Sequence, residues 1–418
     1  MSRGARLAIA AVAVAAIAVG VWQLWRWRQQ VDEQARIAAE RDAAQLAAIE
    51  RTVAQIVARV RDEARLPGLS AAFALPDGRV GTAVAGFADP EQKLRMTPDT
   101  RFLAGSVGKS LHAALAVALA REGTVDLDAP ISRWIGREPW FARLPNARNL
   151  SLRLLLQHRS GLSDHVFSLE FFVRELKLRL FEPDHALIPP EQLIEGAFDR
   201  APLFAPGRGF AYGDTNYVLA GIVIQRATGR SPFDQIEERF LAPLGLAGIL
   251  AARSPRIPGL AIGHQFPVNP FLLPPKMVDE HGLLPIHPML ESTAGGFAAN
   301  PHDLVRWAKA LFEGQALPPD GLAEMTRDPV ATHDGRRYGL GLYRYATPLG
   351  VAWGHGGYFP GYRSGLLYFP DTQIAVAAQA NRDYLADLDP LLLEIAKSVR
   401  SALRAIAEPP PAGASRTP

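Results

Sequence analysis

The sequence predicts an α/β fold of the α+β type, in which both ends of the chain build one antiparallel sheet and a helical lobe is inserted between the two halves. Strand-like runs occupy residues 68–75 and 79–87 and recur between residues 339 and 380. Residues 151–310 are mostly helical with loops between. Strands at both ends of a chain, separated by helices, fit a single sheet backed by helices.

The composition is that of a folded protein larger than one small module. The chain has 418 residues, of which 48% are hydrophobic and 21% charged, and this excludes collagen-like and disordered chains. A net charge of only +3 offers no basic face, so no nucleic-acid partner is expected. Cysteine is absent, so any covalent catalysis would use an oxygen or nitrogen nucleophile.

An apolar run at the N-terminus predicts a membrane anchor. Residues 7–25 carry no charge, and a helix of this length spans about 28 Å at 1.5 Å per residue, close to the thickness of a bilayer core. Three tryptophans and two arginines crowd its far end, as at a membrane interface. We expect an uncleaved transmembrane helix in residues 1–28, because the run exceeds a signal peptide's usual core, and a helical stalk in residues 29–65.

The remaining elements follow in chain order. Pro76-Asp77-Gly78 predicts a hairpin, and residues 107–121 place an apolar stripe on one helical face, which predicts a largely buried helix. Eight prolines between Pro255 and Pro288 predict an extended loop. Late strands are expected over residues 339–345, 349–353, 363–369 and 373–380, then a helix over 391–407 and a disordered tail over 406–418.

Ser106-Val-Gly-Lys109 is the first candidate for chemistry. An offset of three residues puts both side chains on one helical face, close enough for Lys109 to take the proton of Ser106. The site must then favour the neutral amine of Lys109. An S-x-x-K match by itself is common by chance. A phosphate-binding loop would need glycine at position 103, which is Leu103, and a G-x-S-x-G elbow is absent.

Two further segments carry reactive side chains next to glycines. Tyr212 stands two residues before Asp214, which can bring a phenol and an acceptor toward a cleft; the alternative is a core tyrosine before a helix cap. His355 lies in Trp353-Gly-His-Gly-Gly-Tyr358 at a strand margin, where glycines free a backbone N–H for an oxyanion. No histidine has metal-ligand spacing, so no metal is expected.

These three elements, in this order, resemble the serine β-lactamase and penicillin-binding-protein superfamily, in the branch with class C β-lactamases, DD-carboxypeptidases and related esterases. Three connecting segments are also similar: Leu154–Leu162, Phe240–Leu246 and Ser292–Phe297. The resemblance covers residues 66–405 and implies a β-lactamase-like domain there. The family's habit places such a domain in the periplasm, on a single pass through the bacterial inner membrane, or secreted if the N-terminal segment is cleaved.

The resemblance implies a role for each matching residue. Ser106 would be the acylated nucleophile, Lys109 its partner in proton transfer, and Tyr212 the relay to the leaving group. His355 would open the third motif beside the active site. Backbone N–H groups of Ser106 and Tyr358 would form the oxyanion hole. The substrate would contact four further positions: Asp214, Gly356, Gly357 and Arg363.

Two departures from the family pattern bear on the substrate. Asp214 replaces the commonest residue, asparagine, so an amide donor becomes a charged acceptor, which counts against recognition of an acylamino group. The carboxylate would also favour the charged form of Lys109. His355 replaces a lysine and weakens a fixed positive charge, which Arg363 can supply unless it is an ordinary surface arginine.

The predicted function is that of a serine hydrolase that forms an acyl-enzyme at Ser106. Water would be activated by the cluster of Tyr212, Lys109 and His355. The substrate is expected to be an ester, a D-amino-acid peptide from the cell wall or a β-lactam, in falling order, and no metal or organic cofactor is needed. The alternative is a non-catalytic module of the same fold that binds or senses cell-wall fragments.

Overall fold

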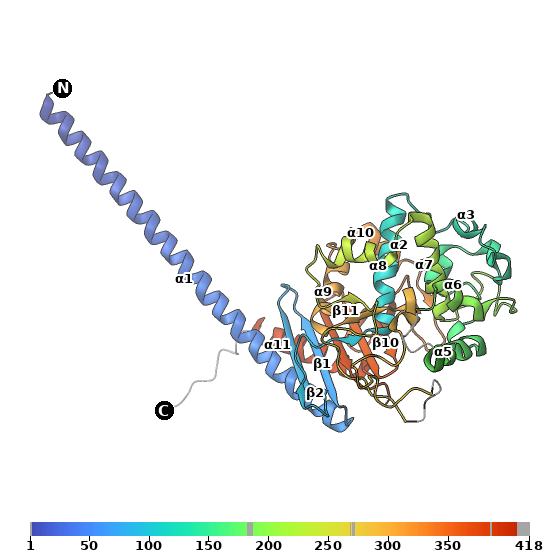
Figure 1. The fold of residues 1–418 in the computed structure, drawn as a ribbon. Coiled ribbons are helices and arrows are strands. Elements are labelled where there is room, and N and C mark those ends of the chain that lie inside the picture. Colours follow the sequence, from blue (N-terminus) through green and yellow to red (C-terminus); the bar gives the residue numbers. More distant parts are fainter. Residues whose placement is uncertain (1, 182–186, 268, 270–271, 385–386, 408–418) are drawn as a thin grey trace. The chain divides into compact units, whose positions relative to one another are not determined.

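An antiparallel sheet joins the two ends of the chain. The computed structural model describes residues 2–181, 187–267, 269, 272–384 and 387–407, and residues 1–49 and 50–418 form two units. Within the described part of the second unit, the sheet has nine strands in the order β3-β2-β1-β12-β11-β10-β9-β8-β7 (Figure 1). Leu69 of β1 lies opposite Ala380 of β12, so the predicted assembly from both chain ends is confirmed.

The strands of the two described sheets have the following bounds. The large sheet contains β1 Gly68–Ala74, β2 Val80–Asp89, β3 Leu94–Arg95, β7 Val330–Ala331, β8 Arg337–Tyr338, β9 Tyr343–Thr347, β10 Gly350–Phe359, β11 Tyr362–Phe369 and β12 Ile374–Ala380. A small sheet contains β4 Phe102–Leu103, β6 Phe297–Ala299 and β5 Leu250–Ala251. Every residue of β1 and β12 is buried, because both faces of the central strands are covered.

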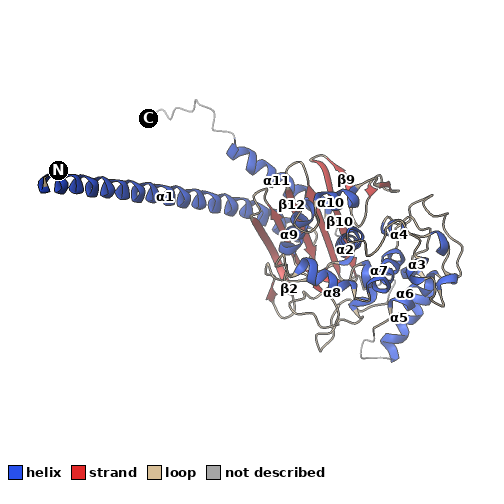
Figure 2. Cartoon of the chain, turned by 90° about the horizontal axis from the view of Figure 1, so that it is seen from above, coloured by secondary structure: helices blue, strands red, loops and turns tan. Residues whose placement is uncertain are grey.

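Helices cover the sheet and form the inserted lobe. Their bounds are α2 Lys109–Arg121, α3 Ser132–Ile135, α4 Leu152–Leu156, α5 Leu169–Phe181, α6 Pro190–Leu193, α7 Asp214–Thr228, α8 Pro232–Ile236, α9 Pro301–Phe312, α10 Pro319–Thr326 and α11 Asp389–Ala407. Helix α9 packs on β1 and β12, and α11 packs on β12. Helices α3 to α7 gather at one side of the sheet (Figure 2). Side chains of α2 and α7 share one hydrophobic core.

Two segments that carry candidate residues differ from expectation. Ser106 belongs to a 3₁₀ turn, η1 (Gly105–Gly108), and α2 begins only at Lys109. The segment around His355 lies inside β10, where Gly357 pairs with Ser364, and not at a strand margin. A Cβ on Gly357 would lie 2.0 Å from the carbonyl oxygen of Ala104. Glycine at this position therefore lets β10 run close beside the chain that leads into η1.

The long proline-rich stretch is irregular, as expected. Between β5 and the 3₁₀ segment η7 (Pro288–Ala294), the described residues form no helix or strand and are linked by isolated bridges such as His264 with Lys276. A high density of proline removes backbone donors and fixes φ, which prevents regular pairing.

The first unit contains the beginning of helix α1 (Arg3–Glu63). None of the described helices is long and apolar enough to cross a membrane. This finding contradicts the predicted anchor in residues 1–28 and, with it, the predicted single-pass location in the bacterial inner membrane.

The second unit begins within α1, earlier than the expected domain start at residue 66. Val53 and Val57 are fully buried. Glu50 accepts a hydrogen bond from the backbone N–H of Thr82 at 3.1 Å. The end of the helix is therefore packed into this unit. At the other end, the predicted tail covers residues 406–418; residues 406 and 407 belong to the end of α11, and residues 408–418 lie outside the described residues.

Candidate active site

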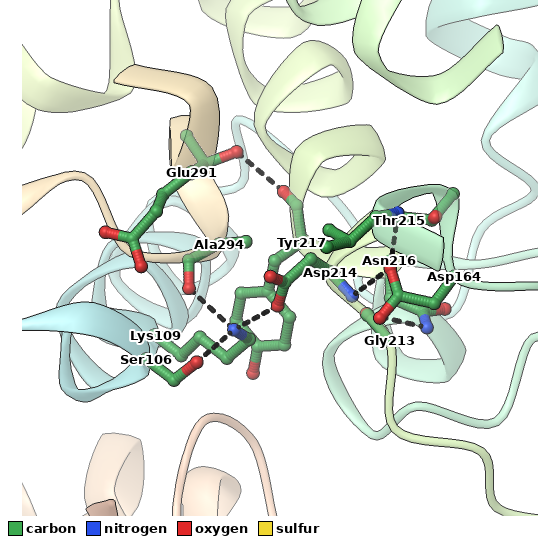
Figure 3. A network of polar contacts seen from close by, with 12 residues as sticks. Ser106, Lys109, Asp164, Gly213, Asp214, Thr215, Asn216, Tyr217, Glu291 and Ala294 are labelled. Atoms are coloured by element: carbon green, nitrogen blue, oxygen red, sulfur yellow. Dashed lines mark hydrogen bonds and ion pairs between the residues drawn. The ribbon is translucent and has the colours of Figure 1, made fainter. Parts of the chain in front are cut away.

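Ser106 and Lys109 lie where the 3₁₀ turn continues into the buried helix α2. The side chain of Lys109 is completely buried. Its Nζ lies 2.9 Å from Oγ of Ser106, 2.7 Å from Oδ1 of Asp214 and 2.6 Å from the carbonyl oxygen of Ala294 (Figure 3). Three elements that are distant in the sequence, η1, α7 and η7, thus supply the surroundings of one amine.

This geometry suits both protonation states of the lysine. A neutral amine has two N–H donors and one lone pair. The carboxylate of Asp214 and the carbonyl of Ala294 can only accept, so they take the two N–H groups and leave the lone pair for the O–H of Ser106. Once the proton has moved, a third N–H faces the alkoxide. The arrangement can therefore remove a proton from Ser106 without moving any heavy atom.

Two further carboxyl groups surround the ion pair of Lys109 and Asp214. Oδ1 of Asp164 accepts from the backbone N–H of Asp214 at 3.2 Å (Figure 3), and burial together with the charge of Asp214 raises the pKa of Asp164 to about 7. Burial raises the pKa of Glu291 to about 8. Asp214 sits in the first turn of α7, where the helix dipole favours a negative charge. The raised pKa values of Asp164 and Glu291 thus reduce the negative charge that the carboxyl groups place around Lys109.

Tyr212 stands beside the nucleophile. Nζ of Lys109 lies 5.0 Å from its ring centroid, and Tyr212 and Ser106 line the same cavity. Burial, with the nearby charge of Asp214, raises the pKa of Tyr212 well above its ordinary value. The phenol therefore keeps its proton at neutral pH and can act as a donor.

His355 is a neutral side chain inside β10. Its Nδ1 donates to the carbonyl oxygen of Gly356 at 2.5 Å, and its Nε2 accepts from the hydroxyl of Tyr338 at 3.1 Å. Burial, with the positive charge of Lys109, lowers the pKa of His355 to about 3. The histidine therefore offers no fixed positive charge to a substrate at neutral pH.

The backbone of β10 lies close to the turn η1, and Gly105 makes this close approach possible. Gly105 has a left-handed φ of +57°, and a Cβ placed on it would lie 2.5 Å from the backbone nitrogen of Tyr358. No other residue type fits between the two segments. The amide of Tyr358 thus lies next to Ser106, in the place where the sequence predicts half of an oxyanion hole.

A cavity of about 730 Å³ opens over these groups. Arg363 is a cation on its wall; its Nε donates to the carbonyl oxygen of Asp383 at 2.7 Å, and its guanidinium lies 4.7 Å from the ring centroid of Tyr358. The lining includes seven of the nine predicted site residues, without Lys109 and Asp214: Ser106, Tyr212, His355, Gly356, Gly357, Tyr358 and Arg363. The structure therefore brings seven of the predicted residues to one cavity, and Lys109 connects Ser106 with Asp214 beside it.

A second, smaller cavity of about 90 Å³ is lined by Asp214 and Tyr358. Its walls are mainly apolar and come from the helical lobe, the proline-rich stretch and β10: Val166, Phe171, Leu273, Ile286, Leu290 and Phe359. Glu291 and Glu175 add carboxyl groups to the lining. The cavity therefore combines an apolar surface with acidic groups.

Sequence reasoning missed several residues of the site. Asp164 follows the family-like segment Leu154–Leu162 by two residues, and Glu291 directly precedes Ser292–Phe297. Both could have been found by extending these segments. Arg336 and Tyr343 also line the large cavity, with the guanidinium 4.2 Å from the ring centroid, but no motif surrounds them.

Fold and site define a class: an α+β protein in which a serine hydroxyl lies beside a buried lysine. The chain belongs to the beta-lactamase family, whose model matches residues 50–399. The family predicted from the sequence is therefore confirmed.

Three similar proteins support a hydrolase. A D-aminopeptidase from Gluconobacter oxydans (strain 621H) is 28% identical over 326 residues, which are 76% of this chain and only 57% of that protein. Esterase EstB from Burkholderia gladioli is 29% identical over 70% of this chain and 75% of its own length. A D-stereospecific amidohydrolase from Streptomyces sp. superposes with a TM-score of 0.69 at 27% identity, covering 84% of this chain and 97% of its own. These likenesses indicate serine hydrolase activity in general terms.

The fit at Gly105 can be tested with a matched pair of glycines. We expect Gly105→Ala to lower any Ser106-dependent hydrolysis by at least about a hundredfold, because the new Cβ would displace the amide of Tyr358. Gly123→Ala is the control, since Gly123 has a φ of +74° but a Cβ placed on it would meet no atom within 4 Å. Equal loss of kcat in both variants would show that backbone strain alone is responsible.

The raised pKa of Glu291 predicts a pH-dependent stability. A carboxyl group whose pKa rises on folding favours the native state fully below its ordinary value of 4.5, and this stabilisation falls as the pH rises toward about 8. Relative to Glu291→Gln, the parent should lose on the order of 1 kcal/mol per pH unit in this window. Urea unfolding at pH 5, 6, 7 and 8 measures the difference; parallel profiles would contradict a buried neutral carboxyl group.

Proposed function

We propose that this protein is a serine hydrolase that acts through an acyl-enzyme at Ser106. The single observation that supports this most strongly is the Nζ of Lys109, buried and held 2.9 Å from Oγ of Ser106 by two groups that can only accept hydrogen bonds. A serine hydroxyl is a weak nucleophile unless a base removes its proton. The lone pair of Lys109 is the base in this proposal.

Acylation then proceeds with a balanced transfer of protons. Oγ of Ser106 attacks the substrate carbonyl carbon while its proton passes to Lys109. The carbonyl oxygen becomes negatively charged and accepts hydrogen bonds from the backbone N–H groups of Ser106 and Tyr358. Tyr212 gives its phenolic proton to the departing alcohol or amine, and the ammonium of Lys109 restores that proton. The lysine ends this step neutral.

Deacylation repeats the sequence with water. A water molecule in the large cavity attacks the acyl carbon and passes a proton to Lys109. The bond to Oγ breaks, and the proton returns to Ser106. His355 takes no part as a cation in this scheme; its neutral ring accepts a hydrogen bond from the hydroxyl of Tyr338. Its expected catalytic role stays a prediction.

Asp214 and the small cavity support a particular acyl group. A carboxylate repels the carbonyl oxygen of an acylamino substituent and attracts a protonated amine. The apolar walls beside it can take a hydrocarbon side chain, and Arg363 can contact an anionic leaving part. We therefore propose esters and amides of amino acids with a free amine as substrates. The D-stereospecific names of two relatives support the D configuration.

Labelling of the nucleophile tests the reaction itself. We expect a fluorophosphonate to add once to the parent protein, as measured by intact mass, and not to Ser106→Ala. Hydrolysis of p-nitrophenyl acetate and D-phenylalanine p-nitroanilide should depend on the same residue. Ser254→Ala, at an exposed position, is the control. Absence of an adduct and of turnover in the parent would contradict the proposal and favour a non-catalytic binding module.

Substitution of Asp214 tests the proposed acyl group. In the parent, D-phenylalanine p-nitroanilide should react faster than its N-acetyl derivative. Asp214→Asn keeps an acceptor for Lys109 but removes the charge, so the ratio of the two kcat/KM values should shift toward the N-acetyl compound by about tenfold. Asp320→Asn, in α10, should leave the ratio unchanged. An unchanged ratio in Asp214→Asn would exclude contact between Asp214 and the amine.

A further inference from the structure

His158 is a buried residue of the family-like segment Leu154–Leu162 to which the proposed mechanism gives no role. It follows α4 and is completely buried. Its φ of +56° lies in the left-handed region, which few residues other than glycine occupy. Such a conformation costs on the order of 1–3 kcal/mol and persists only where the surroundings enforce it.

The local turn accounts for the backbone conformation but not for the choice of histidine. The N–H of Arg159 donates to the carbonyl of Leu154, and the N–H of His158 donates to the carbonyl of Leu155. These two bonds form a Schellman motif, in which the left-handed position is usually glycine. Glycine would satisfy the same turn with less strain. The side chain of His158 must therefore provide something that glycine cannot.

The side chain and the backbone carbonyl of His158 accept hydrogen bonds from the two residues that flank Tyr212. The carbonyl oxygen of His158 accepts from the N–H of Ala211 at 3.0 Å, and its Nδ1 accepts from the N–H of Gly213 at 3.3 Å. The two bonds fix the backbone directly before and directly after the tyrosine. The segment that carries Tyr212 has no helix or strand of its own to hold it.

The imidazole ring of His158 also packs against the ring of Tyr212. The two ring centroids are 4.3 Å apart, and Tyr338, which bonds His355, lies 4.9 Å away on the same histidine. Because Nδ1 accepts, the proton of the neutral ring is on Nε2. Burial, with the positive charge of Lys109, keeps the pKa of His158 well below its ordinary value, so the acceptor at Nδ1 stays available.

We propose that His158 is the positioning residue of Tyr212: it forms hydrogen bonds to the backbone on both sides of the tyrosine and so orients the phenol toward the leaving group. This proposal rests on the proposed function, in which Tyr212 protonates the leaving group. The proposal predicts different effects on the attack by Ser106 and on the protonation of the leaving group by Tyr212. Loss of this positioning should weaken proton donation by Tyr212 and leave the attack by Ser106 almost intact.

Two substitutions at His158 test the proposal. His158→Gly keeps the turn and relieves its strain but removes the ring and its acceptor. His158→Asn tolerates the left-handed conformation and places Oδ1 near the position of Nδ1. Lys93→Gly is the matched control, because Lys93 has the same φ of +56° and is exposed.

Two substrates that share an acyl group separate positioning from a merely structural role. The p-nitrophenolate of the p-nitrophenyl ester of D-phenylalanine leaves without protonation. The ammonia of D-phenylalanine amide must be protonated as it leaves. His158→Gly should lower kcat for the amide by about a hundredfold and for the ester by less than about threefold, with KM unchanged. His158→Asn should restore the amide reaction to within about fivefold of the parent, and Lys93→Gly should match the parent.

Other outcomes are equally informative. An equal loss on both substrates, or no loss, would overturn the positioning role, and failure of His158→Asn to restore the amide reaction would overturn the acceptor at Nδ1. Fluorophosphonate labelling of Ser106 is measured in every variant. If the parent itself shows no turnover that depends on Ser106, the proposed function fails; if only the difference between substrates is missing, the inference about His158 fails alone.

Discussion

The buried amine of Lys109 is the group on which the rest of the site depends. A charged or polar group removed from water must be fully hydrogen-bonded, because leaving it without partners costs several kcal/mol. Here the partners come from α7, η7 and η1, so the site exists only when these three elements are packed together. The interaction that prepares Ser106 thus also ties the helical lobe to the segment in front of β6.

Glycines and small residues make this packing possible. β10 can lie against the nucleophile turn because Gly357 faces the carbonyl of Ala104 and Gly105 faces the amide of Tyr358. Alanines dominate β12, which lets α9 and α11 approach it closely. Backbone groups, which have no rotamers to select, are thereby held rigidly around the reactive serine.

Burial sets much of the electrostatic character of the site. Substitution of a lysine by His355 removes a permanent cation, since burial and the neighbouring ammonium keep this histidine neutral. Three carboxyl groups near Lys109 make the region acidic in composition. However, the pKa values of Asp164 and Glu291 are raised, so most of the negative charge rests on Asp214. The proposed selectivity for a protonated amine rests on that single carboxylate.

The sequence by itself determined the family, the antiparallel sheet from both chain ends and the spacing of Ser106 and Lys109, because these depend on local patterns that are visible in one dimension. Tertiary structure decided which groups satisfy the lysine, that β10 extends through His355, and that Asp164, Glu291 and His158 belong to the site. Burial and long-range contacts control these features, and neither has a local signature. The apolar run at residues 7–25 misled, since its interpretation as an anchor rested on composition and the described helices include none able to span a membrane.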